Sequence, residues 1–204
     1  MSQGRRSLRG RGGLTLFGLG RKRRSAADQL KSGSWHCAQC GADHGWPFDL
    51  AAFAPDPWTG PVSYEDNAGL RMKGDFLSED FCVLGGEYFM IRAVLLIPVQ
   101  GLEEPFGIGC WSTLSRTNFE KYIEGFDDGT YPDWGPWSGW LCNQLADYVG
   151  PDPLAVSVEP RKDRQRALLW VQEDGHPLAV AQDQGITPER VLEIFAYYGH
   201  GPKL

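Results

Sequence analysis

The sequence lacks any apolar run long enough to cross a membrane, and it has only five cysteines in 204 residues. Its longest apolar segment, residues 88–99, is interrupted by Arg92 and falls well short of the about 20 residues that a bilayer requires. Because five cysteines cannot all pair in disulfides, the sequence suits a reducing cytoplasm better than secretion. The short apolar segment 14–19 is followed by the basic residues 21–24, where a secretory signal would need small residues. We therefore expect a cytoplasmic protein without a membrane anchor.

Acidic residues are scarce at the N-terminus. Residues 1–34 contain nine Lys/Arg and one acid, Asp28, which leaves eleven bases and 25 acids, a net charge of −14, in residues 35–204. The basic segment is rich in Gly, Arg and Ser without periodicity, so we predict that residues 1–34 form a disordered basic tail. The acidic body, residues 35–204, is unsuited to binding nucleic acid, so only the tail could contact nucleic acid. The acidic body would instead attract a basic partner.

Several catalytic signatures are also missing. The sequence contains no Gly-rich phosphate loop, no nucleophile elbow and no metal motif that combines histidine with carboxylates. These absences weaken an enzymatic interpretation without excluding it.

The hydrophobic pattern predicts the fold class. Residues 88–99 and 106–115 flank a polar turn and predict a central hairpin, preceded by a short strand at 81–84. Residues 154–159 and 167–172 predict a second hairpin. Helices are predicted from Thr117, which with Glu120 has the spacing of a capping box, from Pro177, and from Thr187 followed by Pro188. We predict one α+β domain over residues 35–204: an antiparallel sheet with helices packed on it and a zinc-knuckle-like turn near its N-terminus.

A Cys-x-x-Cys motif opens the predicted domain. Cys37 and Cys40 supply half of a tetrahedral zinc site, and Gly41 suits a tight metal-binding turn. His44 is the expected third ligand and Cys82 the expected distant fourth, which would make the zinc structural. A set of three ligands plus water would instead make it catalytic. The alternative is a pair of thiols in a loop without metal.

Two further features could carry function. Arg92 stands in an apolar strand, where we predict a buried ion pair with Asp80 or Glu87; the alternative is an anchor for an anionic ligand. A tryptophan cluster could line a groove for a sugar, a peptide or a flat ring, or could pack a loop-rich region. Its members are Trp134, Trp137 and Trp140.

Several local patterns together resemble a prokaryotic family of uncharacterised proteins, domain of unknown function (DUF) 2199. They cover roughly residues 35–196, and Ala93 departs from the usual Gly of the family pattern. The resemblance implies a fold unit and a metal site but no reaction. The matching stretches are C-x-x-C-G-x-x-H at 37–44, S-E-D-F-C at 78–82, F-M-I-R at 89–92, I-P-V at 97–99, Phe106 with G-C-W at 109–111, L-S at 114–115, N-F at 118–119, G-W-L at 139–141, H-P-L at 176–178 and G-I at 185–186.

The sequence thus favours a non-catalytic domain, stapled by structural zinc, that binds a protein partner. The alternative is a zinc-dependent hydrolase, or a thiol oxidoreductase that uses Cys37 and Cys40.

Overall fold

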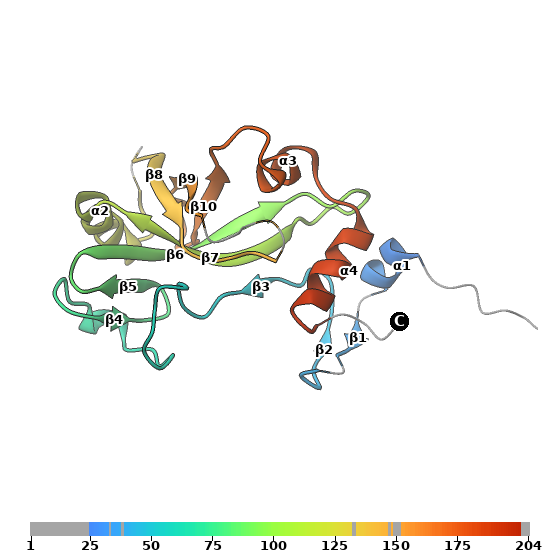
Figure 1. Cartoon of the computed structure of the whole chain (residues 1–204), viewed down its shortest axis with the longest axis horizontal. Helices are drawn as coiled ribbons and strands as arrows, with labels where there is room; N and C mark the ends of the chain where they lie inside the picture. The colour runs from blue at the N-terminus through green and yellow to red at the C-terminus, as the bar shows by residue number, and fades with distance from the viewer. Residues whose placement is uncertain are drawn as a thin grey trace, which may run out of the picture.

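The computed structural model describes residues 25–32, 34–37, 39–131, 134–146, 148 and 152–200. No helix within these ranges has the length and apolar character needed to span a membrane. The elements, shown in Figure 1, are α1 (Ala26–Lys31), β1 (Trp35–His36), β2 (Asp43–His44), β3 (Leu50–Ala51), the short 3₁₀ helix η1 (Asn67–Gly69), β4 (Phe76–Leu77), β5 (Phe81–Leu84), β6 (Tyr88–Ile97), β7 (Phe106–Leu114), α2 (Arg116–Phe126), β8 (Trp137–Leu141), β9 (Leu154–Glu159), β10 (Ala167–Val171), α3 (Pro177–Gln184) and α4 (Pro188–Tyr197).

Strands β6 to β10 close into a five-stranded barrel. Each pairs antiparallel with the next along the chain, and β10 then pairs parallel with β6 through Ala167 and Leu168, opposite Ala93 and Val94. A closed meander with an odd number of strands must contain one such parallel pair. The predicted α+β domain is confirmed, but the simple antiparallel sheet is wrong, because strand periodicity carries no information about which edges meet.

The two long strands also extend beyond the barrel. One edge of β6 pairs with β5 over residues 88–91 and then with β10 at 93–94. The edge of β7 that does not pair with β6 likewise pairs with β3 at Ile108 and Gly109 and with β8 at Ser112. In the view of Figure 1, β4 and β5 lie below β6 and β8–β10 lie above it, although β5 and β10 pair with successive parts of the same edge. The two strands therefore belong to the barrel and to its extension at once.

Both faces of β6 are covered, as its apolar pattern predicted. Phe89, Ile91 and Ile97 lie in the main core, while Met90 lies in a second, smaller core with Trp111. Burying one apolar side chain such as Ile91 or Met90 contributes about 1.5–3 kcal/mol. The central hairpin is thus the element on which both cores are built.

The C-terminal helix begins as predicted, and α2 does not. The Thr187 hydroxyl accepts a hydrogen bond from the Arg190 amide at 3.2 Å, and Pro188 is the first residue of α4. In α2 the N-cap is Ser115, whose hydroxyl accepts from the Asn118 amide at 3.2 Å. The expected cap, Thr117, is inside the helix, because Ser115 already has the extended backbone that a cap requires.

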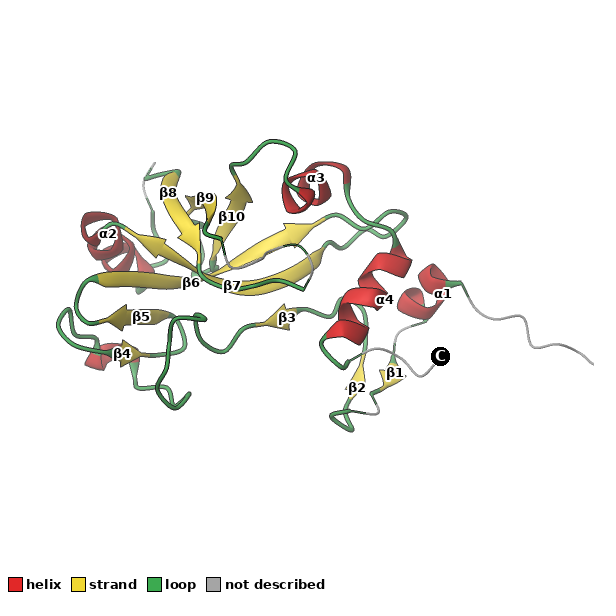
Figure 2. Cartoon of the chain, viewed as in Figure 1, coloured by secondary structure: helices red, strands yellow, loops and turns green. Residues whose placement is uncertain are grey.

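A helix lies within the range predicted as tail. The Ser25 hydroxyl caps α1 by accepting from the Asp28 amide at 3.1 Å, and Leu30 is fully buried in the main core. Helix α1 contacts α4 (Figure 2). A composition averaged over 34 residues hides one capped turn that carries one buried leucine. Residues 1–24 lie outside the described residues, so the predicted disorder there stays a prediction.

Candidate metal centre

The Cys-x-x-Cys motif lies in the turn between β1 and β2. These strands pair antiparallel, with Trp35 opposite His44. The Cys37 amide donates to the Ala42 carbonyl at 2.8 Å, and the Gly41 amide donates to the Cys37 carbonyl at 3.0 Å. Gly41 has a φ of 71°, a left-handed conformation that glycine adopts without steric cost. The sequence therefore bends back on itself within six residues.

The end of α4 brings a second segment to this turn. Gly199 has a φ of 77° and follows the helix, and the His200 amide then donates to the Phe195 carbonyl at 2.7 Å. The Trp35 indole Nε1 donates to the His200 carbonyl at 3.0 Å, which fixes the C-terminal segment against β1. His200 is thus held against the hairpin by backbone contacts of its own.

Four possible metal ligands meet at this junction, namely Cys37, Cys40, His44 and His200. One ligand atom from each lies within 4.8 Å of all the others. Cys40 Sγ is 3.2 Å from His44 Nε2, and Cys37 Sγ is 3.8 Å from His200 Nδ1. Bonds of about 2.0–2.3 Å in a tetrahedral zinc site place neighbouring ligand atoms about 3.3–3.8 Å apart. The cluster could therefore hold a metal ion with little rearrangement.

The turn also favours the ligating form of Cys37. The backbone N–H of Cys40 points at this sulfur and, with smaller contributions from Gln39 and His200, lowers the pKa of the Cys37 thiol to about 6. The thiolate is the form that binds metals. Amide groups oriented towards a sulfur are thus part of the site.

An aromatic cluster links the site to the main core. The ring of Phe195 in α4 lies 5.5 Å from that of Trp35, 5.0 Å from that of Phe48 and 5.4 Å from that of Phe106 in β7. Phe48 in turn lies 4.1 Å from the imidazole of His44. Figure 2 shows the hairpin beneath α4, at one end of the molecule. The position of His44, which contacts Phe48, and that of His200, which follows α4, therefore depend on how α4 packs on β7.

The structure does not bring Cys82 to this cluster. Cys82 lies in β5, fully buried in the second core between Leu77 and Met90, and burial raises the pKa of its thiol to about 12. The structure therefore places His200, and not Cys82, beside the other three possible ligands. The available signal was that His200 directly follows the helix-ending Gly199, which can return the chain to a neighbouring segment.

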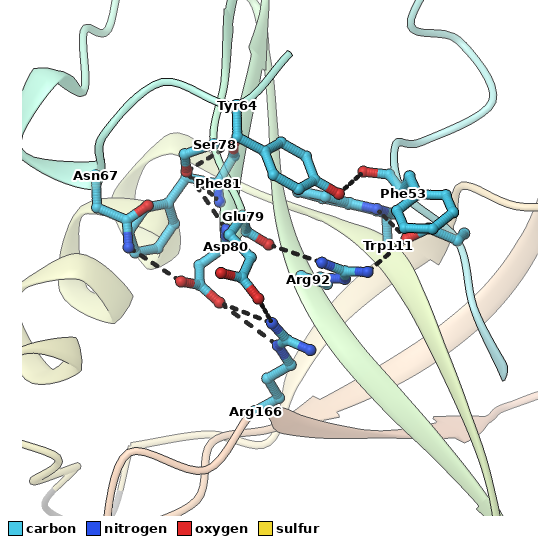
Figure 3. A network of polar contacts seen from close by, with 11 residues as sticks. Phe53, Tyr64, Asn67, Ser78, Glu79, Asp80, Phe81, Arg92, Trp111 and Arg166 are labelled. Carbon is cyan, nitrogen blue, oxygen red and sulfur yellow. Dashed lines mark hydrogen bonds and ion pairs between the residues drawn. The ribbon is translucent and has the colours of Figure 1, made fainter. Parts of the chain in front are cut away.

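Arg92 is buried, but its partners are not those predicted. Its side chain donates to the backbone carbonyls of Ala52 at 3.0 Å and Glu79 at 3.4 Å (Figure 3). Its guanidinium also lies 6.0 Å from the ring centre of Trp111. Within the described residues Arg92 makes no ion pair with a carboxylate, because a buried cation can be hydrogen-bonded by main-chain oxygens instead.

Asp80 has other partners. Its carboxylate accepts from Asn67 Nδ2 at 3.0 Å and forms an ion pair with Arg166 at 3.4 Å (Figure 3). Its link to Arg92 is through the backbone, where the Arg92 amide donates to the Asp80 carbonyl at 2.9 Å. The predicted Arg92–Asp80 side-chain pair is therefore corrected to an Arg166–Asp80 pair.

The three tryptophans do not line one groove. Trp134 and Trp137 pack against the main core, whereas 52% of Trp140 is exposed. Trp137 and Trp140 are three positions apart on β8, so their side chains leave opposite faces of the strand. Of these three tryptophans, Trp140 is the one that is exposed as a large aromatic contact.

The family model described as "Uncharacterized protein conserved in bacteria (DUF2199)" matches residues 36–186. The chain belongs to this family. The match includes Cys37, Cys40 and His44 and ends before His200. No curated protein and no solved structure matches the chain.

Proposed function

We propose that the protein is a non-catalytic interaction domain whose fold is stapled by a structural zinc ion bound to Cys37, Cys40, His44 and His200. The observation that carries this proposal is the mutual approach of four ligand atoms, all within 4.8 Å of one another. Two thiolates and two imidazoles are a common donor set of structural zinc. The family is described as uncharacterised, so a zinc site would add a specific property to the family assignment.

The ligand count favours a structural over a hydrolytic role. Four protein ligands fill a tetrahedral shell, whereas a hydrolytic zinc keeps one position for water. The geometry also favours metal over dithiol chemistry. Two imidazoles lie within 3.2 Å and 3.8 Å of the two sulfurs, and a strand (β2) rather than a helix follows Cys40. A redox dithiol needs neither histidine and usually precedes a helix.

Zinc at this position would join distant parts of the chain. Three ligands lie on or beside the β1–β2 hairpin, and His200 follows α4. Because a preformed site rarely exists in an unfolded chain, the free energy of metal binding contributes directly to folding. The hairpin makes few other hydrogen-bonded pairings, since β1 and β2 form a sheet of two strands on their own. The ion would therefore fix the hairpin to the end of α4.

Metal analysis tests the proposal. Full-length protein without a polyhistidine tag, purified under reducing conditions, should contain one zinc per chain by mass spectrometry. Co²⁺ replacement should give the absorption of a tetrahedral site with two thiolates. The Cys82→Ala variant is the matched control and should retain one zinc. Protein without metal, or a cobalt spectrum showing a five-coordinate site that exchanges water, would contradict the proposal.

A further inference from the structure

Three adjoining hollows surround Tyr88, at the start of β6. Their volumes are about 430, 660 and 430 Å³, and Tyr88 and Thr113 line all three of them. Trp140 lines two of the three. We refer to these hollows together as the Tyr88–Trp140 surface. It lies outside the metal centre and shares no residue with it.

Two exposed aromatic side chains of this surface are carried by strands of the sheet. Tyr88 is 61% exposed and Trp140 is 52% exposed. The Trp140 amide donates to the Thr113 hydroxyl at 2.9 Å, and Trp140 pairs with Ala155 across β8 and β9. Tryptophan and tyrosine are the residues that most often dominate binding at protein interfaces. Holding them on the barrel reduces the ordering cost of binding.

The surface carries charge of one sign. Its lining residues include Asp56, Glu87 and Asp152, and none of them is a lysine, arginine or histidine. Asp56 is fixed in place, since its carboxylate accepts from Asn143 Nδ2 at 2.9 Å and from the Gln144 amide at 2.7 Å. A basic residue beside the surface, Arg116, is already paired with Glu120 at 2.9 Å. The described lining of the hollows therefore holds carboxylates and no basic side chain, and Arg116 beside it is paired with a carboxylate of its own helix.

We propose that the Tyr88–Trp140 surface docks a basic segment of a partner protein, with an arginine or lysine side chain packed against the two rings. A cation over an aromatic face gains about 0.5–2 kcal/mol, and tryptophan is the best such acceptor. The carboxylates add attraction for a cation, repel an anion and give a neutral ligand no comparable gain. The net charge of −14 on residues 35–204 steers basic partners towards the body.

This inference rests on the proposed role as an interaction domain but not on the zinc ion. The two can therefore fail separately. Variants of the surface should keep one zinc per chain, so a loss of binding in zinc-loaded protein would be assigned to the surface alone. Protein that was purified without bound metal and still bound the probe would contradict the structural zinc and support the docking surface.

A peptide titration tests the docking surface. The probe is an acetylated peptide of four Gly-Arg repeats, added to the full-length protein and followed by calorimetry. The expected result is binding that weakens with salt. The double variant Tyr88→Ala/Trp140→Ala should lower the affinity at least about tenfold, which corresponds to about 1.4 kcal/mol. Tyr197→Ala is the matched control, because Tyr197 is 67% exposed on α4, and it should bind like the parent.

Each other outcome overturns the proposal. The same peptide with glutamine in place of arginine should not bind, so equal binding would remove the role of the cation. An equal loss in the Tyr197→Ala variant would indicate unspecific attraction, as would an unchanged affinity in the double variant. The basic N-terminal segment of the chain is the competing occupant. If replacing residues 21–24 by glutamine in the full chain strengthened peptide binding, that segment would be the occupant instead of a partner.

Discussion

The Sγ of Cys37 lies 3.8 Å from the Nδ1 of His200, although 163 residues separate the two in the chain. The contact joins the first hairpin of the described chain to the turn that ends α4. Neither residue is brought there by the barrel strands. The Cys/His cluster therefore lies at one end of the molecule, beside the barrel and outside it.

His200→Ala should remove the fourth ligand. Because losing an outer-shell partner alone typically lowers metal affinity about 10–100-fold, losing a ligand should lower the zinc affinity by more than roughly a hundredfold. Competition with a chromophoric chelator measures this affinity. His36→Ala is the control from the same hairpin, since His36 is exposed and pairs with Asp43 at 3.0 Å, outside the Cys/His cluster. Equal affinities in the two variants would exclude His200 from the site.

Thiol accessibility should follow the division of the cysteines into metal ligands and core residues. Burial raises the pKa of Cys82 and of Cys142 to about 12, so at pH 8 both are almost entirely protonated and unreactive. Their alkylation by iodoacetamide should speed up about tenfold per pH unit as the thiolate fraction grows below that pKa. Mass spectrometry of the modified peptides gives the rates.

Metal removal should change the alkylation rates of Cys37 and Cys40 and leave that of Cys82 unchanged. A strong chelator should expose Cys37 and Cys40, adding two fast-reacting thiols at pH 8, while Cys82 stays slow. If Cys82 reacted together with Cys37, it would belong to the metal centre after all.

Some local features were predictable from the sequence, whereas the contacts between distant segments were not. Thr187 and Pro188 mark the start of α4 because a cap and a proline act within one turn. The position of His200 against Cys37, and of Ala167 beside Ala93, depends on the packing of segments far apart in the chain. No periodicity encodes such meetings. The expectation for Cys82 rests on its place just before the central hairpin, from which a sheet could carry it back toward the turn, but the structure buries Cys82 in the second core.

Double-mutant cycles should separate the partners of Asp80. The Arg166–Asp80 pair should show a coupling energy of about 0.2–1 kcal/mol, as expected for a partly exposed ion pair. The Arg92–Asp80 side-chain coupling should be near zero, because Arg92 is held by the carbonyls of Ala52 and Glu79. Urea unfolding of the single and double variants gives both values. A larger coupling for Arg92–Asp80 would restore the ion pair that the sequence suggested.

Arg92→Ala should itself be costly. It removes a buried guanidinium and leaves two main-chain carbonyls without that donor, so we expect a loss of about 2–4 kcal/mol in the free energy of unfolding. Arg116→Ala is the exposed control, since it breaks an exposed i,i+4 pair with Glu120 at 2.9 Å and should cost less than about 1 kcal/mol. Similar losses for the two would show that Arg92 is solvated.

Leu30→Ala tests whether α1 belongs to the domain. Leu30 is fully buried in the main core, so truncation should lower the free energy of unfolding by about 2–5 kcal/mol. Val180→Ala in α3 is the control, because Val180 is 39% exposed and should change stability little. An unchanged melting temperature for Leu30→Ala would support the tail boundary at residue 34 that the sequence predicted.

Gly139→Ala tests the closure of the barrel. Strands β7 and β8 are joined at the pair Ser112–Leu141, and next to it Gly139 packs against β7. A Cβ at this position would clash with the Thr113 carbonyl oxygen and lie 2.5 Å from the Ser112 hydroxyl. Since a backbone atom cannot move aside cheaply, the substitution should cost about 1–3 kcal/mol. Ser138→Ala is the neighbouring control; its side chain is exposed and the change should stay within about 0.5 kcal/mol. If Gly139→Ala were as stable as that control in urea unfolding, β8 would not lie against β7, and the five strands would form an open sheet.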